Sequence, residues 1–248
     1  MLSIYTLKSA SEASRYYESG DYYVGSQPLE QSRWLGQGAL ELKLEGVVAP
    51  EVFKKLLSGY LPNGVVMQQV QKGYHHRPGY DLTFSAPKSV SLLALVSGNQ
   101  AILQAHREAV CETLLKIEQK YAAVRNKHQG VITPEKTGNF LMALFEEYDS
   151  RAGDPHLHHH AVILNMTLKQ HGTWRTLYFD EIYQDKLING LEYRAALAKK
   201  LMALGYELNF KPGGLFEIKG IPEALIQHFS KRRVAIETWL QDHEASGG

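Results

Sequence analysis

The sequence is poor in cysteine, in net charge and in long apolar runs. Cys111 is the only cysteine among 248 residues, which excludes an internal disulfide framework and fits a reducing compartment. No apolar run approaches the roughly 20 residues that span a bilayer, and the N-terminus lacks a signal-peptide layout. A formal net charge of +1 argues against a uniformly basic surface, so nucleic-acid binding would need local patches such as residues 72–77. These absences favour a cytoplasmic protein without membrane insertion.

The composition is that of a folded chain with a sizeable core. Hydrophobic residues make up 44% of the sequence, and the length fits one large domain or two small ones. No repeat, low-complexity segment or clear interdomain linker divides the sequence, so we expect a single domain over residues 1–248. The last residues, 244–248, form a tail that we expect to be disordered.

Hydrophobic periodicity predicts strands mixed with long helices. Helices are predicted over residues 9–20, 51–57, 87–98, 100–125, 181–204 and 222–243. Strands are predicted over residues 80–85, 139–148, 158–168, 173–178, 206–210 and 215–219. Hairpins combined with long helices are typical of an antiparallel sheet with helices packed on it, which is an α+β fold.

The stretch "RAGDPHLHHHAVILN", residues 151–165, places four histidines in front of a short apolar run. Side chains alternate between the two faces of a strand, so His158 and His160 would point one way and His159 the other. Two imidazoles side by side on one face suit a metal ion. A polar strand end without a metal is the alternative reading of the same pattern.

Two tyrosine pairs stand near the N-terminus, Tyr16-Tyr17 and Tyr22-Tyr23. Tyrosines at a helix end often pack on a core and leave the hydroxyl in water. The functional alternative is a phenolate nucleophile. Since the free side chain has a pKa of about 10, it would need a nearby cation or base to react at neutral pH.

The stretch "RPGYDLTFSAPKSVS", residues 77–91, sets Asp81 at the start of a strand. A carboxylate there could simply accept backbone hydrogen bonds. Beside a histidine-bound metal it could instead orient an imidazole, or take a proton from a tyrosine.

These stretches, in their order along the chain (the tyrosine pairs, then residues 77–91, then residues 151–165), resemble the relaxases of conjugative plasmid transfer, the MobF class of TrwC/TraI type. The resemblance covers essentially the whole chain, from Leu2 to about Trp239. It implies the palm-like, two-layer fold of the His-hydrophobic-His endonucleases, with about five central strands. It also implies a site- and strand-specific single-stranded DNA endonuclease and strand transferase that nicks a transfer origin.

By the same resemblance the first tyrosine of each pair is the reactive one. Tyr16 would perform the first transesterification and remain joined to the 5′ phosphate, and Tyr22 would perform a second one. Tyr17 and Tyr23 would support them. Asp81 matches the family's acidic residue beside the metal and the nucleophile.

The family's third metal-binding histidine is replaced in this sequence. It belongs eleven residues before His158, where this chain has Glu147. In one interpretation Glu147 is a ligand beside His158 and His160, and the carboxylate favours Mg²⁺ or Mn²⁺. In the other, His156 replaces the missing ligand, or metal binding is impaired.

A surface that binds single-stranded DNA is expected to combine cationic side chains with aromatic rings on which bases stack. Candidate phosphate contacts are Arg77, Lys88, Arg151 and Arg175, and candidate stacking residues are Trp174, Tyr74 and Trp34. The tryptophans would equally suit a core. The resemblance implies a monomeric domain that binds single-stranded or hairpin DNA of a transfer origin. It also implies accessory and coupling proteins as partners.

Three other functions fit parts of the sequence. A rolling-circle replication initiator would share the tyrosines and the metal site. A single-strand binding module could have lost its metal through Glu147. An ordinary metal-dependent phosphodiesterase would use water and leave both products free.

Overall fold

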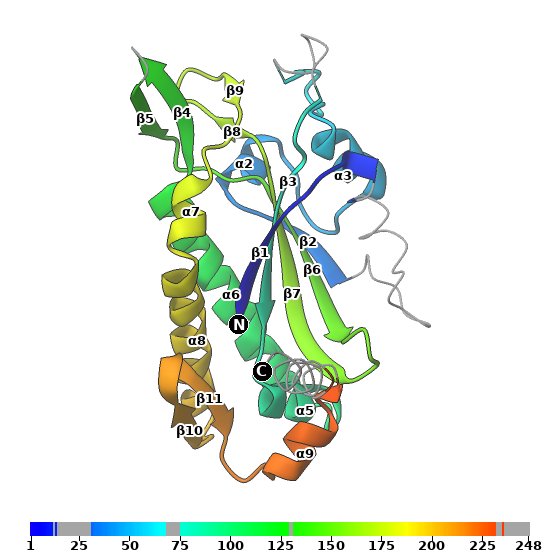
Figure 1. Ribbon diagram of the computed structural model, residues 1–248. Helices are drawn as coiled ribbons and strands as arrows, with labels where there is room; N and C mark the ends of the chain where they lie inside the picture. Colours follow the sequence, from blue (N-terminus) through cyan, green and yellow to red (C-terminus); the bar gives the residue numbers. More distant parts are fainter. Residues whose placement is uncertain (12, 14–30, 68–74, 129–130, 232–234, 236–248) are drawn as a thin grey trace, which may run out of the picture.

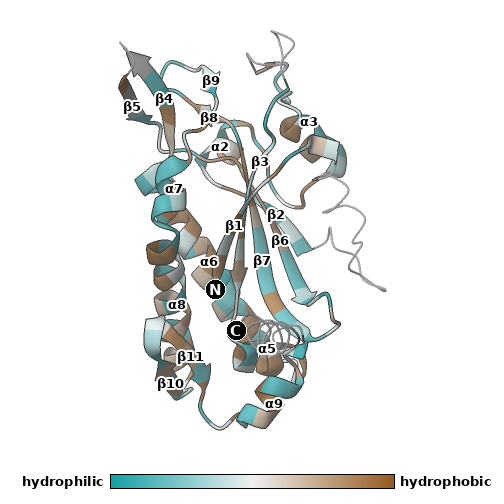
Figure 2. Ribbon diagram, viewed as in Figure 1, coloured by the Kyte–Doolittle hydropathy of each residue, from teal (hydrophilic) through white to brown (hydrophobic). Residues whose placement is uncertain are grey.

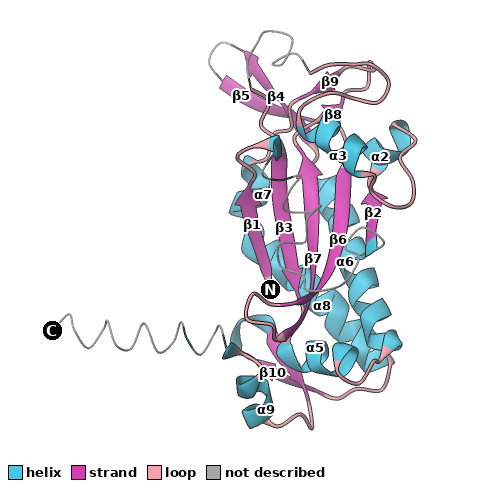
Figure 3. Ribbon diagram, turned by 90° about the vertical axis from the view of Figure 1, so that its right-hand side faces the viewer, coloured by secondary structure: helices cyan, strands magenta, loops and turns pink. Residues whose placement is uncertain are grey.

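A five-stranded antiparallel sheet forms the centre of the computed structural model, which describes residues 1–11, 13, 31–67, 75–128, 131–231 and 235. Figure 3 shows its strands side by side in the order β1-β3-β7-β6-β2. They are β1 (Leu2–Thr6), β2 (Ser32–Leu35), β3 (Gly79–Ser85), β6 (Met142–Asp149) and β7 (Pro155–Leu164). The predicted α+β fold with about five central strands is confirmed.

Strand β7 lies in the middle of the sheet and is paired along most of its length. It runs antiparallel to β3 from Gly79 opposite Leu164 to Ser85 opposite His158. Gly79 fits where a side chain would not, because a Cβ there would lie 2.3 Å from the Ile163 carbonyl oxygen. This close approach fixes the start of β3 against the end of β7.

Helices cover one whole face of the sheet (Figures 1 and 3). They are α5 (Lys88–Leu95), α6 (Gln100–Tyr121) and α8 (Lys186–Ala203). The main core lies between these helices and alternate strand residues, among them Leu157, Ala161 and Ile163 of β7. Asn99 caps the start of helix α6, and its side chain accepts hydrogen bonds from the backbone N–H groups of Ala101 and Ile102.

A second, smaller core covers only part of the opposite face. Helices α2 (Gln37–Glu41) and α3 (Pro50–Leu57) pack there on the other set of strand residues, including Val162 and Leu164. The end of β7 nearer the β6–β7 turn is not part of this core. In Figure 2 that end of β6 and β7 is mostly hydrophilic. The polar half of this face is where His158 and His160 lie.

The two longest predicted helices of the middle of the chain have different bounds in the structure. The helix predicted to reach residue 125 ends at Tyr121, because residues from Ala123 pair in a hairpin formed by β4 (Ala123–His128) and β5 (Val131–Lys136). The helix predicted over 181–204 is two helices, α7 (Asp180–Gln184) and α8, separated at Asp185. The Asp185 carboxylate accepts a hydrogen bond from the Tyr121 hydroxyl at 2.7 Å. This bond attaches the junction of α7 and α8 to α6.

The last predicted helix is also interrupted. Helix α9 (Glu223–His228) ends before Phe229 and Ser230, and the expected tail, 244–248, lies outside the described residues. The hairpin expected before it is present as β10 (Leu208–Lys211) and β11 (Leu215–Ile218), joined by η2 (Pro212–Gly214). Among the described residues, no helix combines the length and apolar character needed to cross a bilayer.

The predicted strand over 158–168 begins earlier and is divided. Strand β7 begins at Pro155, so His156 belongs to the strand rather than preceding it. The chain leaves the sheet after Leu164, and β8 (Thr167–Leu168) pairs separately with β9 (Trp174–Arg175). The sequence pattern could not show this break, because apolar residues continue through it.

Glu118 ties the helical layer to the sheet. Its Oε1 accepts the backbone N–H groups of Gln37 at 2.8 Å and Phe140 at 2.7 Å, and its side chain is buried. One carboxylate of α6 therefore satisfies donors at the start of α2 and just before β6. Without it, both donors would lose their partner inside the protein.

We predict that Glu118→Ala lowers the free energy of unfolding by about 3 kcal/mol, because buried donors without partners are costly. Glu112→Ala on the same helix is the matched control. Glu112 is exposed and pairs only with lysines, so its loss should change stability by less than about 0.5 kcal/mol. Urea unfolding of both variants measures the difference, and equal losses would contradict the role of Glu118.

Candidate metal centre

Three potential metal ligands converge from two adjoining strands. Glu147 of β6 stands directly opposite His158 of β7, and His160 follows two positions further along the same face. The alternation of side chains along a strand explains why the two histidines point together. All three side chains are buried.

Their ligand atoms are close enough to share one ion. Glu147 Oε2 lies 3.1 Å from His158 Nε2 and 3.6 Å from His160 Nε2. One ligand atom from each residue lies within 4.8 Å of the others. Two imidazoles and a carboxylate form a donor set that fits a divalent cation.

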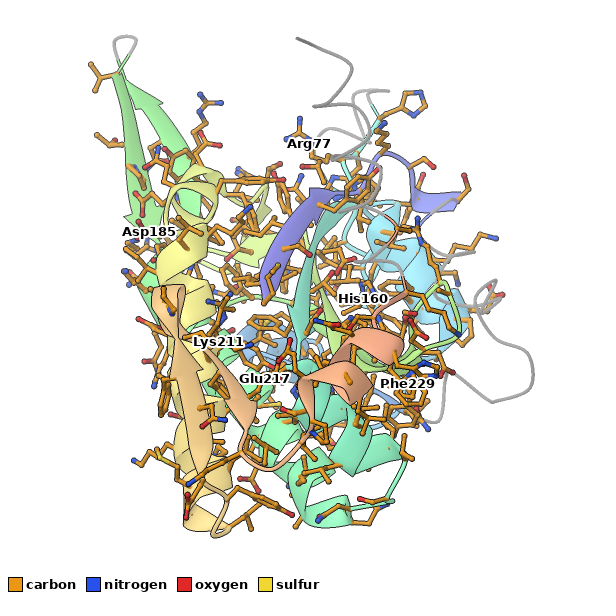
Figure 4. All side chains as sticks on the ribbon, turned by 60° about the horizontal axis from the view of Figure 1, so that its bottom comes forward. Arg77, His160, Asp185, Lys211, Glu217 and Phe229 are labelled. Carbon is orange, nitrogen blue, oxygen red and sulfur yellow. The ribbon has the colours of Figure 1, made fainter. Side chains whose placement is uncertain are left out.

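The other ring nitrogen of each histidine is held by an oxygen. His160 Nδ1 lies 2.7 Å from Asp81 Oδ2, and His158 Nδ1 lies 2.7 Å from the backbone oxygen of His156. Because a carbonyl and a carboxylate accept hydrogen bonds, each Nδ1 carries the proton and donates it. This leaves both Nε2 atoms facing Glu147 and orients the rings for a metal. Figure 4 labels His160 in the middle of the view, among the side chains of this end of the sheet.

The charges around the site favour a cation. Burial alone would lower the pKa of His160, but Asp81 and Glu147 outweigh it and raise this pKa to about 10. Burial would likewise raise the pKa of Glu147, yet hydrogen bonds from His158 and His160 hold it well below its ordinary value. Two carboxylates thus create a negative field in which a bound positive charge is stabilised.

The remaining histidines of the cluster do not join the ligand set. His156 points to the same face as His158, and their ring centroids are 4.6 Å apart. Burial and the charges of His158 and Lys88 lower the pKa of His156 to about 3. His159 lies on the opposite face, as expected, and its Nδ1 is 3.0 Å from His106 Nε2.

A basic cavity lies at the other end of the sheet. It has a volume of about 530 Å³ and includes two of the predicted DNA-binding residues, Arg77 and Arg175, in its lining. Arg125 of β4 and Lys169 add two further cations. Figure 4 shows Arg77 well separated from His160. No local sequence pattern could have singled out Arg125 and Lys169, since they reach the cavity from separate hairpins.

The other predicted DNA-binding residues are placed differently. Arg151 is exposed in the β6–β7 turn, and Lys88 donates a hydrogen bond to the backbone oxygen of Pro155 at 2.8 Å. Both lie at the metal end of β7. Trp174 and Trp34 are buried in the smaller core, so burial favours packing rather than base stacking for both rings.

Five of the predicted site residues lie outside the described part of the chain. They are Tyr16, Tyr17, Tyr22, Tyr23 and Tyr74. Their predicted roles stay predictions.

Comparisons with known proteins give one consistent result. Residues 5–248 match the family described as TrwC relaxase. The multifunctional conjugation protein TraI of Escherichia coli is 40% identical over 248 residues, 95% of this chain. The chain spans 14% of the length of that curated relative.

Two solved structures of TrwC are also similar. TrwC complexed with a 27-mer DNA comprising the recognition hairpin and the cleavage site is 40% identical, with a TM-score of 0.87. That match covers 98% of this chain and 84% of the other. The metal-bound complex of TrwC with oriT DNA is 42% identical, with a TM-score of 0.87, and the match covers 100% of this chain and 84% of the other.

We predict that Glu147→Ala weakens Mn²⁺ binding at least about tenfold, because it removes one of three converging ligands. His156→Ala is the matched control and should change the affinity by less than about twofold, because its ring is not in the ligand set. Calorimetric titration of the DNA-free protein measures both affinities. A larger effect from His156→Ala would show that the ligands are assigned wrongly.

Proposed function

The chain belongs to the TrwC relaxase family, and we propose that it is a site- and strand-specific single-stranded DNA endonuclease and strand transferase of plasmid conjugation. The observation that carries this proposal is the convergence of Glu147, His158 and His160, with Asp81 bound to His160. It occurs in a chain that matches the family over residues 5–248. The proposed substrate is a transfer origin, the DNA to which TrwC is bound in similar structures.

The metal centre suits an attack on a phosphodiester. The non-bridging oxygens of the phosphate are negative and repel an approaching phenolate. A divalent cation held by Glu147, His158 and His160 would neutralise this charge and orient the phosphate. Mg²⁺ and Mn²⁺ are the proposed ions, because a carboxylate ligand suits hard cations.

Tyr16 is the proposed nucleophile of the first step. Its hydroxyl oxygen forms a bond to phosphorus while the bond from phosphorus to the 3′ oxygen breaks. The tyrosine loses its proton and the 3′ oxygen gains one, so the products are a free 3′ hydroxyl and a 5′ phosphotyrosine. The covalent bond keeps the energy needed for rejoining, which attack by water would lose. Tyr22 would carry out a second transfer, with Tyr17 and Tyr23 in support.

Asp81 is proposed to have two roles, one toward the metal ligand His160 and one toward the nucleophile. One of its oxygens, Oδ2, orients His160, whereas Oδ1 has no hydrogen-bond partner among the described residues. A buried carboxylate oxygen without a partner is unfavourable on its own. In the proposed mechanism this oxygen accepts the proton of the attacking tyrosine.

The basic cavity is the proposed contact surface for DNA away from the cleaved bond. Arg77, Arg125, Lys169 and Arg175 would neutralise phosphates there, while Arg151 lies at the metal end. Hairpin or single-stranded origin DNA is the proposed ligand. Accessory and coupling proteins, a monomeric domain and a bacterial cytoplasmic location are further parts of the proposal, and they rest on family resemblance.

We predict that the protein forms a covalent adduct with a labelled oligonucleotide that carries its origin hairpin and cleavage site, in the presence of Mg²⁺ or Mn²⁺. Tyr16→Phe should abolish the adduct, since it removes the attacking oxygen. Tyr60→Phe, at an exposed tyrosine that follows α3, is the control and should keep the adduct. Denaturing gel electrophoresis separates the products. Two free products would indicate a phosphodiesterase that uses water, and binding without cleavage would indicate a binding module.

We also predict that Arg77→Ala combined with Arg175→Ala weakens binding of the same DNA about tenfold at moderate salt. Loss of two phosphate contacts should lower the slope of log affinity against log salt by about 2. Arg194→Ala is the control, because Arg194 binds the Gly213 backbone oxygen instead of lining the cavity. Fluorescence anisotropy over a salt series measures the slope. An unchanged slope would exclude this cavity as the phosphate-binding surface.

A further inference from the structure

A buried chain of polar side chains lies directly behind the candidate metal centre. It stands on the helical face of the sheet, inside an otherwise apolar core. Its members are Tyr193 of α8, His106 and Arg107 of α6, His159 of β7 and Glu146 of β6. Tyr193 and His106 are 0% exposed, His159 is 2% and Glu146 is 6%. None of these groups takes part in the proposed reaction.

Hydrogen bonds join Tyr193 to His106 and His106 to His159, and an ion pair joins Arg107 to Glu146. The Tyr193 hydroxyl lies 2.9 Å from His106 Nδ1, and His106 Nε2 lies 3.0 Å from His159 Nδ1. His159 Nε2 lies 3.8 Å from Glu146 Oε2. Arg107 Nε donates to the same Glu146 oxygen at 2.6 Å, so Glu146 is also attached to α6.

The chain needs no charge on either imidazole. The contact between Tyr193 and His106 and the contact between His106 and His159 each join one donor to one acceptor, which neutral rings supply. Both rings are buried. The Glu146 carboxylate lies near His159 Nε2, but 3.8 Å is too long for a hydrogen bond.

The strand register places this chain under the ligands. Glu146 and His159 stand opposite each other, and their immediate neighbours Glu147 and His158 are the next opposite pair. His160 follows His159 in the chain. Glu146 and His159 therefore adjoin all three ligands along the chain. Their side chains point to the opposite face of the sheet, where the helices bind them.

We propose that His106 and Tyr193 are positioning residues for the metal centre. They fix His159 from the helical layer, as Arg107 fixes Glu146, and so hold the backbones of β6 and β7 in the relation that brings Glu147, His158 and His160 together. This inference rests on the proposed metal site. It assigns to residues of α6 and α8 an effect on ion binding although they do not touch the ligands.

A purely structural role would not need polar groups here. Burying polar side chains is costly unless each finds a partner, and apolar side chains of similar shape stabilise a core at least as well. A hydrogen-bonded polar chain differs from apolar packing in restricting the arrangements that its members can adopt. Ligand atoms that must meet within a few tenths of an ångström gain from that restriction.

The test compares two tyrosine-to-phenylalanine variants that both lose a buried hydroxyl between α6 and α8. Tyr193→Phe removes the end of the polar chain. Tyr121→Phe removes the bond to Asp185, which has no connection to β6 or β7. We expect both variants to shift the metal-free unfolding temperature by similar amounts, within about 4 °C of each other.

The affinity for Mn²⁺ should separate them in calorimetric titrations without DNA. Tyr193→Phe should weaken binding about threefold to tenfold, less than the roughly 10- to 100-fold effect of losing a group bound directly to a ligand. Tyr121→Phe should stay within about twofold of the unmodified protein. Equal affinities for the two variants would overturn the proposal.

A second variant checks that the chain acts as a unit. Glu146→Gln removes the charge that pairs with Arg107 and weakens the attachment of β6 to α6, so it should weaken Mn²⁺ binding as well. Combined with Tyr193→Phe, the loss should be smaller than the product of the two single losses. Multiplicative losses would contradict a shared chain. A protein that binds Mn²⁺ but forms no DNA adduct would contradict the proposed function and leave this comparison intact.

Discussion

The antiparallel pairing of β6 with β7 is the interaction on which the candidate site depends. Its register places Glu147 opposite His158, and the period of two places His160 on the same face. A slip of one residue would put Glu147 and the two histidines on opposite faces of the sheet. The register itself is held by two cores, because alternate residues of both strands are buried on each side of the sheet.

The position of β6 and β7 within the sheet also helps to hold their register. Strand β7 is central, with β3 on one side and β6 on the other, so neither metal-bearing strand forms the edge. Asp81 of β3 reaches His160 across the β3–β7 pair. Three neighbouring strands therefore contribute to one small site, and each is braced by backbone hydrogen bonds on both sides. Rigid elements of this kind hold ligand atoms more accurately than loops do.

The sequence predicted those features that depend on local alternation. A period of two predicts that His158 and His160 point to one face and His159 to the other, and it predicts the face of Glu147 on its own strand. This needs no knowledge of distant residues. Features that depend on partners far along the chain could not be predicted. Helix α6 ends early because of the β4–β5 hairpin, and α7 separates from α8 where Asp185 meets Tyr121. The basic cavity is likewise assembled from several separate segments.

The location of that cavity has a consequence for the proposed DNA path. Asn165, in the cavity lining, follows His160 by only five positions along an extended strand, a separation on the order of 15 Å. That length corresponds to about four or five stacked nucleotides. A strand paired on both sides cannot stretch. Under the proposed function, β7 would therefore set the distance between the DNA bound at the cavity and the cleaved bond. The number of nucleotides between the bound element and the cleaved bond would then be a fixed property of the fold.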